Sequence, residues 1–235
     1  ASHFFAPTKD EGVTSNPTSL LGTMYLGGFV VPFILTCLLT VLTLTVERFI
    51  ALGKAAGKGN QTKFVAEVKK ALNEKNVAKA EELCKKQQGT VGAIVFSTLG
   101  KYKEMEANTV LPKEQKLAVI QQQLEEATAL EMPSLQQNLP ILATMTTLGT
   151  LLGLFGTVVG MIKSFQALGN AGAPDSAELS KGISEALVNT ASGILTAVCA
   201  LIGYNFFTNK IDNLTYAVDE LGFAIVNAYA ANHAN

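Results

Sequence analysis

Residues 132–162 read MPSLQQNLPILATMTTLGTLLGLFGTVVGMI, and none of these 31 residues is charged. The chain has two further uncharged stretches, at residues 12–46 and 186–209. A helix needs about 20 predominantly apolar residues to cross the roughly 30 Å of hydrocarbon in a bilayer. All three stretches are long enough, so the sequence predicts an all-α membrane protein with three transmembrane helices. The alternative is a soluble protein with unusually apolar buried helices, but three such stretches are hard to bury in a chain of 235 residues.

The charged residues gather in one segment. Only 16% of the chain is charged and the formal net charge is -1, whereas ordinary soluble domains carry roughly 25% charged residues. Residues 48–131 nevertheless hold 14 of the 18 Lys and Arg and 10 of the 19 Asp and Glu. This pattern predicts one sizeable aqueous domain. It argues against a disordered chain and against a nucleic-acid binder that relies on bulk positive charge.

Basic residues beside the spans predict the orientation. Four of them follow the first span with no acid before Glu67: Arg48, Lys54, Lys58 and Lys63. Because cytoplasmic flanks carry the excess of Lys and Arg, we expect the N-terminus in the periplasm and the C-terminus in the cytoplasm of a bacterial inner membrane. The expected segments are a periplasmic segment at 1–19, transmembrane helix 1 at 20–47, a cytoplasmic helical domain at 48–131, transmembrane helix 2 at 132–166, a periplasmic loop at 167–181, transmembrane helix 3 at 182–209 and a cytoplasmic C-terminal helix at 210–235.

The predicted cytoplasmic domain shows helical periodicity and no catalytic motif. Asn76 is expected to cap a helix, and a pattern that begins at Lys113 would give a helix of about 80 Å if it continued unbroken to about Ala167. The only histidines are His3 and His233, and no phosphate loop, Ser/His/Asp set or metal-ligand spacing occurs. We therefore expect no catalytic residues, no metal site, no cofactor and no enzyme.

Two stripes of polar and small residues run along the predicted spans. On the second span the stripe has steps of three and four residues, which place it on one helix face: Thr146, Thr150, Gly153, Thr157, Gly160 and Ser164. The pairs Gly149/Gly153 and Gly156/Gly160 have the spacing at which small residues let helices approach closely. On the third span the stripe is Glu185, Asn189, Ser192 and Thr196, beside a narrow face with Ala186, Thr190, Gly193 and Ala197.

These stripes have two interpretations. They are packing seams, with Glu185 reaching water at the outer interface, or they face each other and line an ion pathway. An ionisable residue in a membrane span is by default a functional hypothesis, and a polar stripe that runs inward from Glu185 favours the second interpretation. In that case Glu185 accepts and releases a proton, while hydroxyl groups replace lost hydration. The expected ion-pathway residues are Glu185, Thr157, Thr190, Asn189 and Ser192, and the expected helix-packing residues are Gly149, Gly153, Gly156, Gly160 and Gly193.

Two motifs within these spans resemble a known family. LGLFGTVVGMI at residues 152–162 and GISEALVNTASG at residues 182–193 are similar to the second-span and third-span signatures of the ExbB/TolQ/MotA proton-channel family. The order of the motifs and the large segment after the first span also match. The three-span layout is closest to ExbB and TolQ, since MotA-type stators usually have four spans, and of these two the chain is taken to resemble the ExbB subunit more.

The resemblance implies a homopentamer that surrounds two copies of an ExbD-like single-span subunit, within membrane lipids. By position, Glu185, Thr157 and Thr190 would face that partner, and a TonB-like transducer would carry energy to the outer membrane. In place of the family's frequent Ala-Pro pair, this chain has Thr146 and Thr147. Together with Asn189 and Ser192, this departure leaves the choice between proton and sodium open.

The expected function is therefore a proton-channel and motor subunit that couples the proton-motive force to TonB-dependent transport across the outer membrane. The alternatives are a TolQ-type subunit for envelope integrity, a related ion-driven stator, and, from a different class, a passive membrane scaffold.

Overall fold

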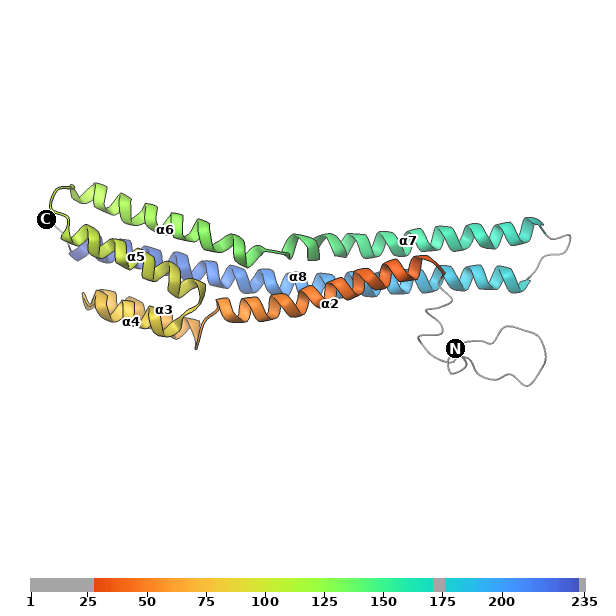
Figure 1. Ribbon diagram of the computed structural model, residues 1–235, viewed down its shortest axis with the longest axis horizontal. Coiled ribbons are helices and arrows are strands. Elements are labelled where there is room, and N and C mark those ends of the chain that lie inside the picture. The colour runs from red at the N-terminus through yellow and green to blue at the C-terminus, as the bar shows by residue number, and fades with distance from the viewer. Residues whose placement is uncertain (1–27, 171–175, 233–235) are drawn as a thin grey trace. The chain divides into compact units, whose positions relative to one another are not determined.

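The computed structural model describes residues 28–170 and 176–232, and all the regular structure in these ranges is α-helix. The all-α prediction is confirmed. The helices are α2 (Val30–Ala55), α3 (Gln61–Asn73), α4 (Val77–Gln87), α5 (Gly89–Ala107), α6 (Lys113–Gln136), α7 (Leu139–Asn170) and α8 (Ser176–Asn232) (Figure 1). The predicted periplasmic segment at 1–19, the beginning of the predicted first span at 20–27, and residues 171–175 of the predicted loop lie outside the described residues.

Within the described residues, three helical segments are long and apolar enough to cross a membrane. They lie within Val30–Ala55, Lys113–Gly169 and Ser176–Asn232, with mean hydropathies of 2.1, 1.7 and 1.8 in their most apolar windows. The predicted number of membrane-spanning helices is therefore confirmed.

The chain forms two compact units. Unit 1 contains residues up to Thr45 together with Pro140–Tyr204, and unit 2 contains Val46–Leu139 together with Asn205–Asn235. Helices α2 and α8 contribute residues to both units.

Unit 2 has an apolar core between short amphipathic helices and the C-terminal part of α8. The largest side chains in this core that are completely or almost completely buried are Leu52, Leu72, Ile94, Leu99, Tyr102, Ile120, Phe207, Leu214, Leu221 and Tyr229. The rings of Tyr102 and Tyr229 meet edge to face with their centroids 4.9 Å apart. At the start of α4 the Asn76 side chain accepts a hydrogen bond from the Lys79 backbone N–H at 3.0 Å, so the predicted cap is confirmed.

The helix that was expected to continue from Lys113 is broken between α6 and α7, at Gln137 and Asn138. Asn138 has φ = +66°, in the left-handed region. Pro140, the second residue of α7, has no N–H to give to the carbonyl of Gln136. The condition for one continuous helix from Lys113 is therefore not met, because a left-handed residue and a proline follow each other closely here.

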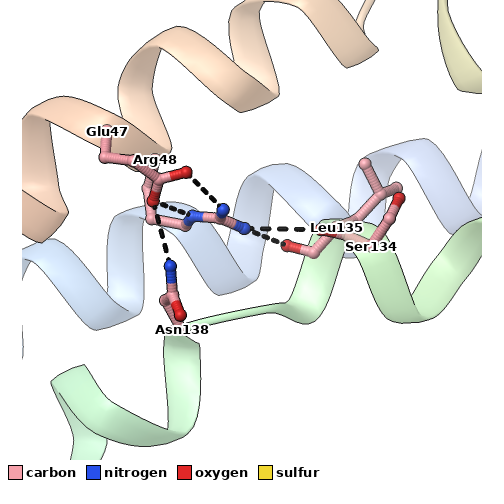
Figure 2. Close-up of polar contacts among 5 residues, drawn as sticks. All are labelled: Glu47, Arg48, Ser134, Leu135 and Asn138. Atoms are coloured by element: carbon pink, nitrogen blue, oxygen red, sulfur yellow. Dashed lines mark hydrogen bonds and ion pairs between the residues drawn. The ribbon is translucent and has the colours of Figure 1, made fainter.

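The side chain of Arg48 binds the end of α6 at this break (Figure 2). In a continuous helix the N–H groups of Asn138 and Leu139 would bond to the carbonyls of Ser134 and Leu135. Arg48 Nη1 instead donates to both carbonyl oxygens, each at 3.4 Å. The buried guanidinium thus supplies hydrogen bonds that the interrupted backbone does not make.

A carboxylate completes the Arg48 cluster. The Glu47 carboxylate accepts two hydrogen bonds from the guanidinium, from Nε at 2.6 Å and from Nη2 at 2.5 Å. The Asn138 side-chain amide also donates to Glu47, at 3.3 Å (Figure 2). The forked pairing matches guanidinium and carboxylate geometry, and it connects the left-handed Asn138 to α2.

Candidate functional site

A seam of small residues joins α7 to α8 in unit 1. A Cβ atom added to Gly149 would lie 3.0 Å from the Gly193 carbonyl oxygen, and one added to Gly153 would lie 3.3 Å from the Asn189 carbonyl oxygen. A Cβ on Gly160 would lie 2.7 Å from the carbonyl oxygen of Gly182. The predicted glycines of α7 and Gly193 of α8 thus meet at one interface, where only residues without side chains allow the two backbones to come this close.

The polar stripe of α8 is buried against this seam. Its exposed fractions are 5% for Glu185, 0% for Asn189, 8% for Ser192 and 0% for Thr196. The hydroxyls of Ser192 and Thr196 donate to carbonyls one turn earlier in the same helix, at 2.7 and 3.0 Å. The helix backbone therefore satisfies these two hydroxyl protons.

Asn189 and Thr190 differ from their hydroxyl-bearing neighbours. Both side-chain polar atoms of Asn189 and the Thr190 hydroxyl oxygen are buried, and within the described residues none of the three has a hydrogen-bond partner. Leaving a buried amide or hydroxyl unpaired costs roughly 1–3 kcal/mol. Three such atoms on two consecutive residues concentrate this cost at one place in the seam.

The stripe of α7 is only partly buried. Gly153, Gly160 and Ser164 are buried, Thr146 and Thr157 are half-buried, and Thr150 is exposed. The Thr157 hydroxyl donates to the Leu154 carbonyl at 2.6 Å. Ser164 donates to the carbonyl of Leu179 on α8 at 3.2 Å, so this end of the stripe contacts the neighbouring helix directly.

Glu185 has a charged partner that the sequence analysis missed. The Nζ atom of Lys163 on α7 lies 2.6 Å from Glu185 Oε1. The signal was present in the sequence, because Gly156, Gly160 and Lys163 follow each other at steps of four and three and so share the helix face that carries the glycines.

Gly28 is a second contact of Glu185 that no sequence pattern indicated. It lies just before α2, has φ = +70°, and a Cβ atom added to it would lie 1.9 Å from Glu185 Oε1. The adjacent Phe29 ring lies under Lys163, with Nζ 5.8 Å from the ring centroid. Residues 28 and 29 thus contact both members of the ion pair.

The site carries no metal-binding cluster in the part of the chain that the structure describes. Across residues 28–170 and 176–232, no three His, Cys, Asp or Glu side chains approach closely enough to hold a metal ion. The chemistry that these residues offer is therefore that of a buried carboxylate, an ammonium group, amides and hydroxyls.

Comparison with known proteins gives similarity to biopolymer-transport and Tol-Pal proteins. The chain is 40% identical over 86 residues to the ExbB-like 3 protein of Synechocystis sp., covering 36% of this chain and 41% of that protein. It is 39% identical over 88 residues to the Tol-Pal system protein TolQ of Pseudomonas aeruginosa, covering 37% and 38%. It is 28% identical over 198 residues to the biopolymer transport protein ExbB of Neisseria meningitidis, covering 80% and 86%.

The matches to the Synechocystis and Pseudomonas proteins span only about two fifths of those relatives. The match to the Neisseria protein extends over most of both chains. The sequence pattern that defines the MotA/TolQ/ExbB proton channel family matches residues 92–220. This region is more than half of the chain and includes both span motifs, so the chain belongs to the MotA/TolQ/ExbB proton channel family.

Proposed function

We propose that this protein is an ExbB-type motor subunit that conducts protons along the seam between α7 and α8. The observation that carries the proposal is the buried polar row of α8, in which Glu185 is almost completely covered and Asn189 and Thr190 keep buried polar atoms without partners in the described chain. The proposed pathway residues are Glu185, Asn189, Thr190, Ser192 and Thr157.

The burial of these polar and charged side chains costs free energy that has to be compensated. A charged side chain in a membrane span costs at least a few kcal/mol, and an unpaired buried amide adds to that cost. Water molecules or a passing cation would give Asn189 and Thr190 the hydrogen bonds that they lack. A carboxylate at the end of the same row can then bind and release the proton.

The assembly proposal is a homopentamer around an ExbD-like dimer. Large apolar side chains remain exposed on the unit 1 helices, among them Phe33, Leu39, Phe155, Phe165 and Leu187. Such surfaces are suited to membrane lipids and to neighbouring copies of the chain. The ExbB/TolQ resemblance supports five copies, the single-span partner and a TonB-like transducer that uses the proton-motive force for transport across the outer membrane.

The proposed location is the bacterial inner membrane, with the N-terminus in the periplasm and the C-terminus in the cytoplasm. The basic residues that follow the first span support this orientation. It places the segment at 48–131 in the cytoplasm.

The test is proton flux into lipid vesicles that contain the chain together with the small single-span protein that copurifies with it. The Glu185→Gln variant should assemble normally and lose flux, because the amide cannot take up and release the proton. Glu178→Gln is the matched control, since Glu178 is an exposed carboxylate on the same helix. Flux that is unchanged in Glu185→Gln would overturn the proposed pathway and favour a passive scaffold. Repeating the measurement with and without sodium identifies the ion.

A TolQ-type role is the second candidate, because TolQ of P. aeruginosa is 39% identical over its matched region. The two roles differ in phenotype. A strain that lacks an ExbB-type subunit should fail to grow on chelated iron or haem, whereas loss of a TolQ-type subunit should cause sensitivity to detergent.

A further inference from the structure

We propose that Lys163 and Gly28 form a latch that covers the Glu185 carboxylate, so that the carboxylate takes up a proton only after the lysine has left it. The inference rests on the proposed function in treating Glu185 as the pathway carboxylate. It adds two positioning residues and a gating contact to the pathway.

The two side chains of the ion pair differ in how much of their surface is exposed. The Glu185 side chain is 7% exposed, whereas the Lys163 side chain is 45% exposed. A lysine has a compact charge on a flexible four-carbon stem, so Lys163 can swing away into a polar environment while the helix backbones stay in place. The buried carboxylate has no such freedom. Opening the latch is therefore a movement of the lysine.

Lys163 and a proton compete for the same oxygen atom of Glu185. The Lys163 Nζ atom donates a charge-assisted hydrogen bond of 2.6 Å to Glu185 Oε1. A proton that binds Glu185 removes this bond and leaves the lysine charge beside a neutral acid. Protonation and lysine pairing therefore exclude each other.

Gly28, which lies just before α2, packs directly against the carboxylate of Glu185. A Cβ atom at this position would lie 1.9 Å from Glu185 Oε1 and 2.6 Å from Cδ. Any side chain would push the carboxylate away from its present position, and this displacement is feasible because the end of a glutamate side chain is flexible. Because Gly28 has no side chain, the carboxylate can occupy its present position. Gly28 thus influences the position of the carboxylate and not its charge.

Few other charges in unit 1 could replace Lys163. The described part of α2 in this unit carries no charged residue, and Lys163 is the only charged residue of α7. On α8 the remaining charged residues of the unit are Glu178 and Lys181, and both are exposed. Lys181 lies four residues before Glu185 on the same helix, so it is a stringent control for a general effect of nearby positive charge.

The experiment measures how fast a hydrophobic carbodiimide modifies Glu185, because this reagent reacts with protonated carboxyl groups. The purified full-length chain is treated at pH 7, and modification of Glu185 is quantified by peptide mass spectrometry. Glu178 provides an internal reference, and Glu185→Gln must abolish the signal. Lys163→Met should be modified about tenfold faster than the wild type, in keeping with one charge-assisted hydrogen bond.

Three further variants separate the effect of charge from the effect of position. Lys163→Arg keeps the positive charge and should react like the wild type, as should Lys181→Met. Gly28→Ala leaves every charge in place but displaces the carboxylate, so its Glu185 should also react faster. Thermal unfolding in detergent identifies a variant that has lost its fold, and the remaining variants then decide the result.

Equal rates in Lys163→Met and the wild type would overturn the latch, and so would equal acceleration by Lys181→Met. The labelling requires no ion conduction. If Glu185→Gln left proton flux unchanged, the proposed function would fail while the labelling rates still decided the ion-pair latch.

Discussion

The Asn189 side chain fills the space that Gly156 leaves on the opposite helix. A Cβ atom placed on Gly156 would lie 2.3 Å from Asn189 Cβ and 2.5 Å from its Cγ. The Cβ atom of Asn189 is fixed to the α8 backbone and cannot turn away. The fit between these two residues therefore sets how closely α7 approaches α8 at this point.

Replacing Gly156 by alanine should destabilise unit 1. The added methyl group has to separate the two helices, and overpacking of this kind typically costs about 1–3 kcal/mol. Thermal unfolding in detergent should show a lower midpoint for Gly156→Ala than for the wild type. Gly169→Ala is the matched control on the same helix, because nothing lies within 4 Å of a Cβ at Gly169. Equal midpoints for both variants would contradict the close packing described here.

Replacing Arg48 by methionine should destabilise unit 2. The variant leaves the carbonyls of Ser134 and Leu135 without the guanidinium and removes the buried partner of Glu47. Leaving buried acceptors unpaired costs roughly 1–3 kcal/mol, so a lower unfolding midpoint is expected. Arg48→Lys should recover only part of the loss, because an ammonium group cannot form the fork. Lys54→Met, an exposed change on the same helix, should have almost no effect, and a drop of similar size there would refute the role of Arg48.

Cys84 should be inert in the folded protein. It is 2% exposed, and burial raises the pKa of its thiol to about 12. The thiol therefore remains protonated at any pH well below 12, and the thiolate that reacts with alkylating reagents is scarce. Iodoacetamide at pH 8 should leave Cys84 unmodified in the native chain and modify it after denaturation, as measured by peptide mass spectrometry. Equal modification in both states would show that this part of unit 2 opens readily.

The sequence alone was sufficient to predict the all-α class and the three spans. The length of an uncharged stretch and the helical periodicity of its residues are local properties that can be read directly from the sequence. The cap at Asn76 was predictable for the same reason. Pro140 was a local sign of the break at Asn138, but the hydrogen bonds of Arg48 to the carbonyls at the break come from a residue distant in the chain and had no local sign. The place of Lys163 on the glycine face of α7 was readable from its steps of three and four, but hydropathy alone does not use these steps and so did not indicate its pairing with Glu185.

Gly28 was not predictable from the sequence. Its importance comes from a backbone position beside a carboxylate far along the chain, and one glycine among many carries no sign of this. The unpaired atoms of Asn189 were equally hidden, since composition shows that an amide is present but not whether it finds a partner.

The direction of the hydroxyl protons has a consequence for what the seam can receive. Thr157, Ser192 and Thr196 each donate to a carbonyl of their own helix, so the oxygen atoms of these three residues have only lone pairs left to offer. A visiting hydronium or metal cation would meet electron density at each of them, whereas chloride would find none of their O–H bonds free to turn toward it. These three hydroxyls therefore favour a positive ion, and the donors that remain in the seam are the side-chain amide of Asn189 and the hydroxyl of Thr190.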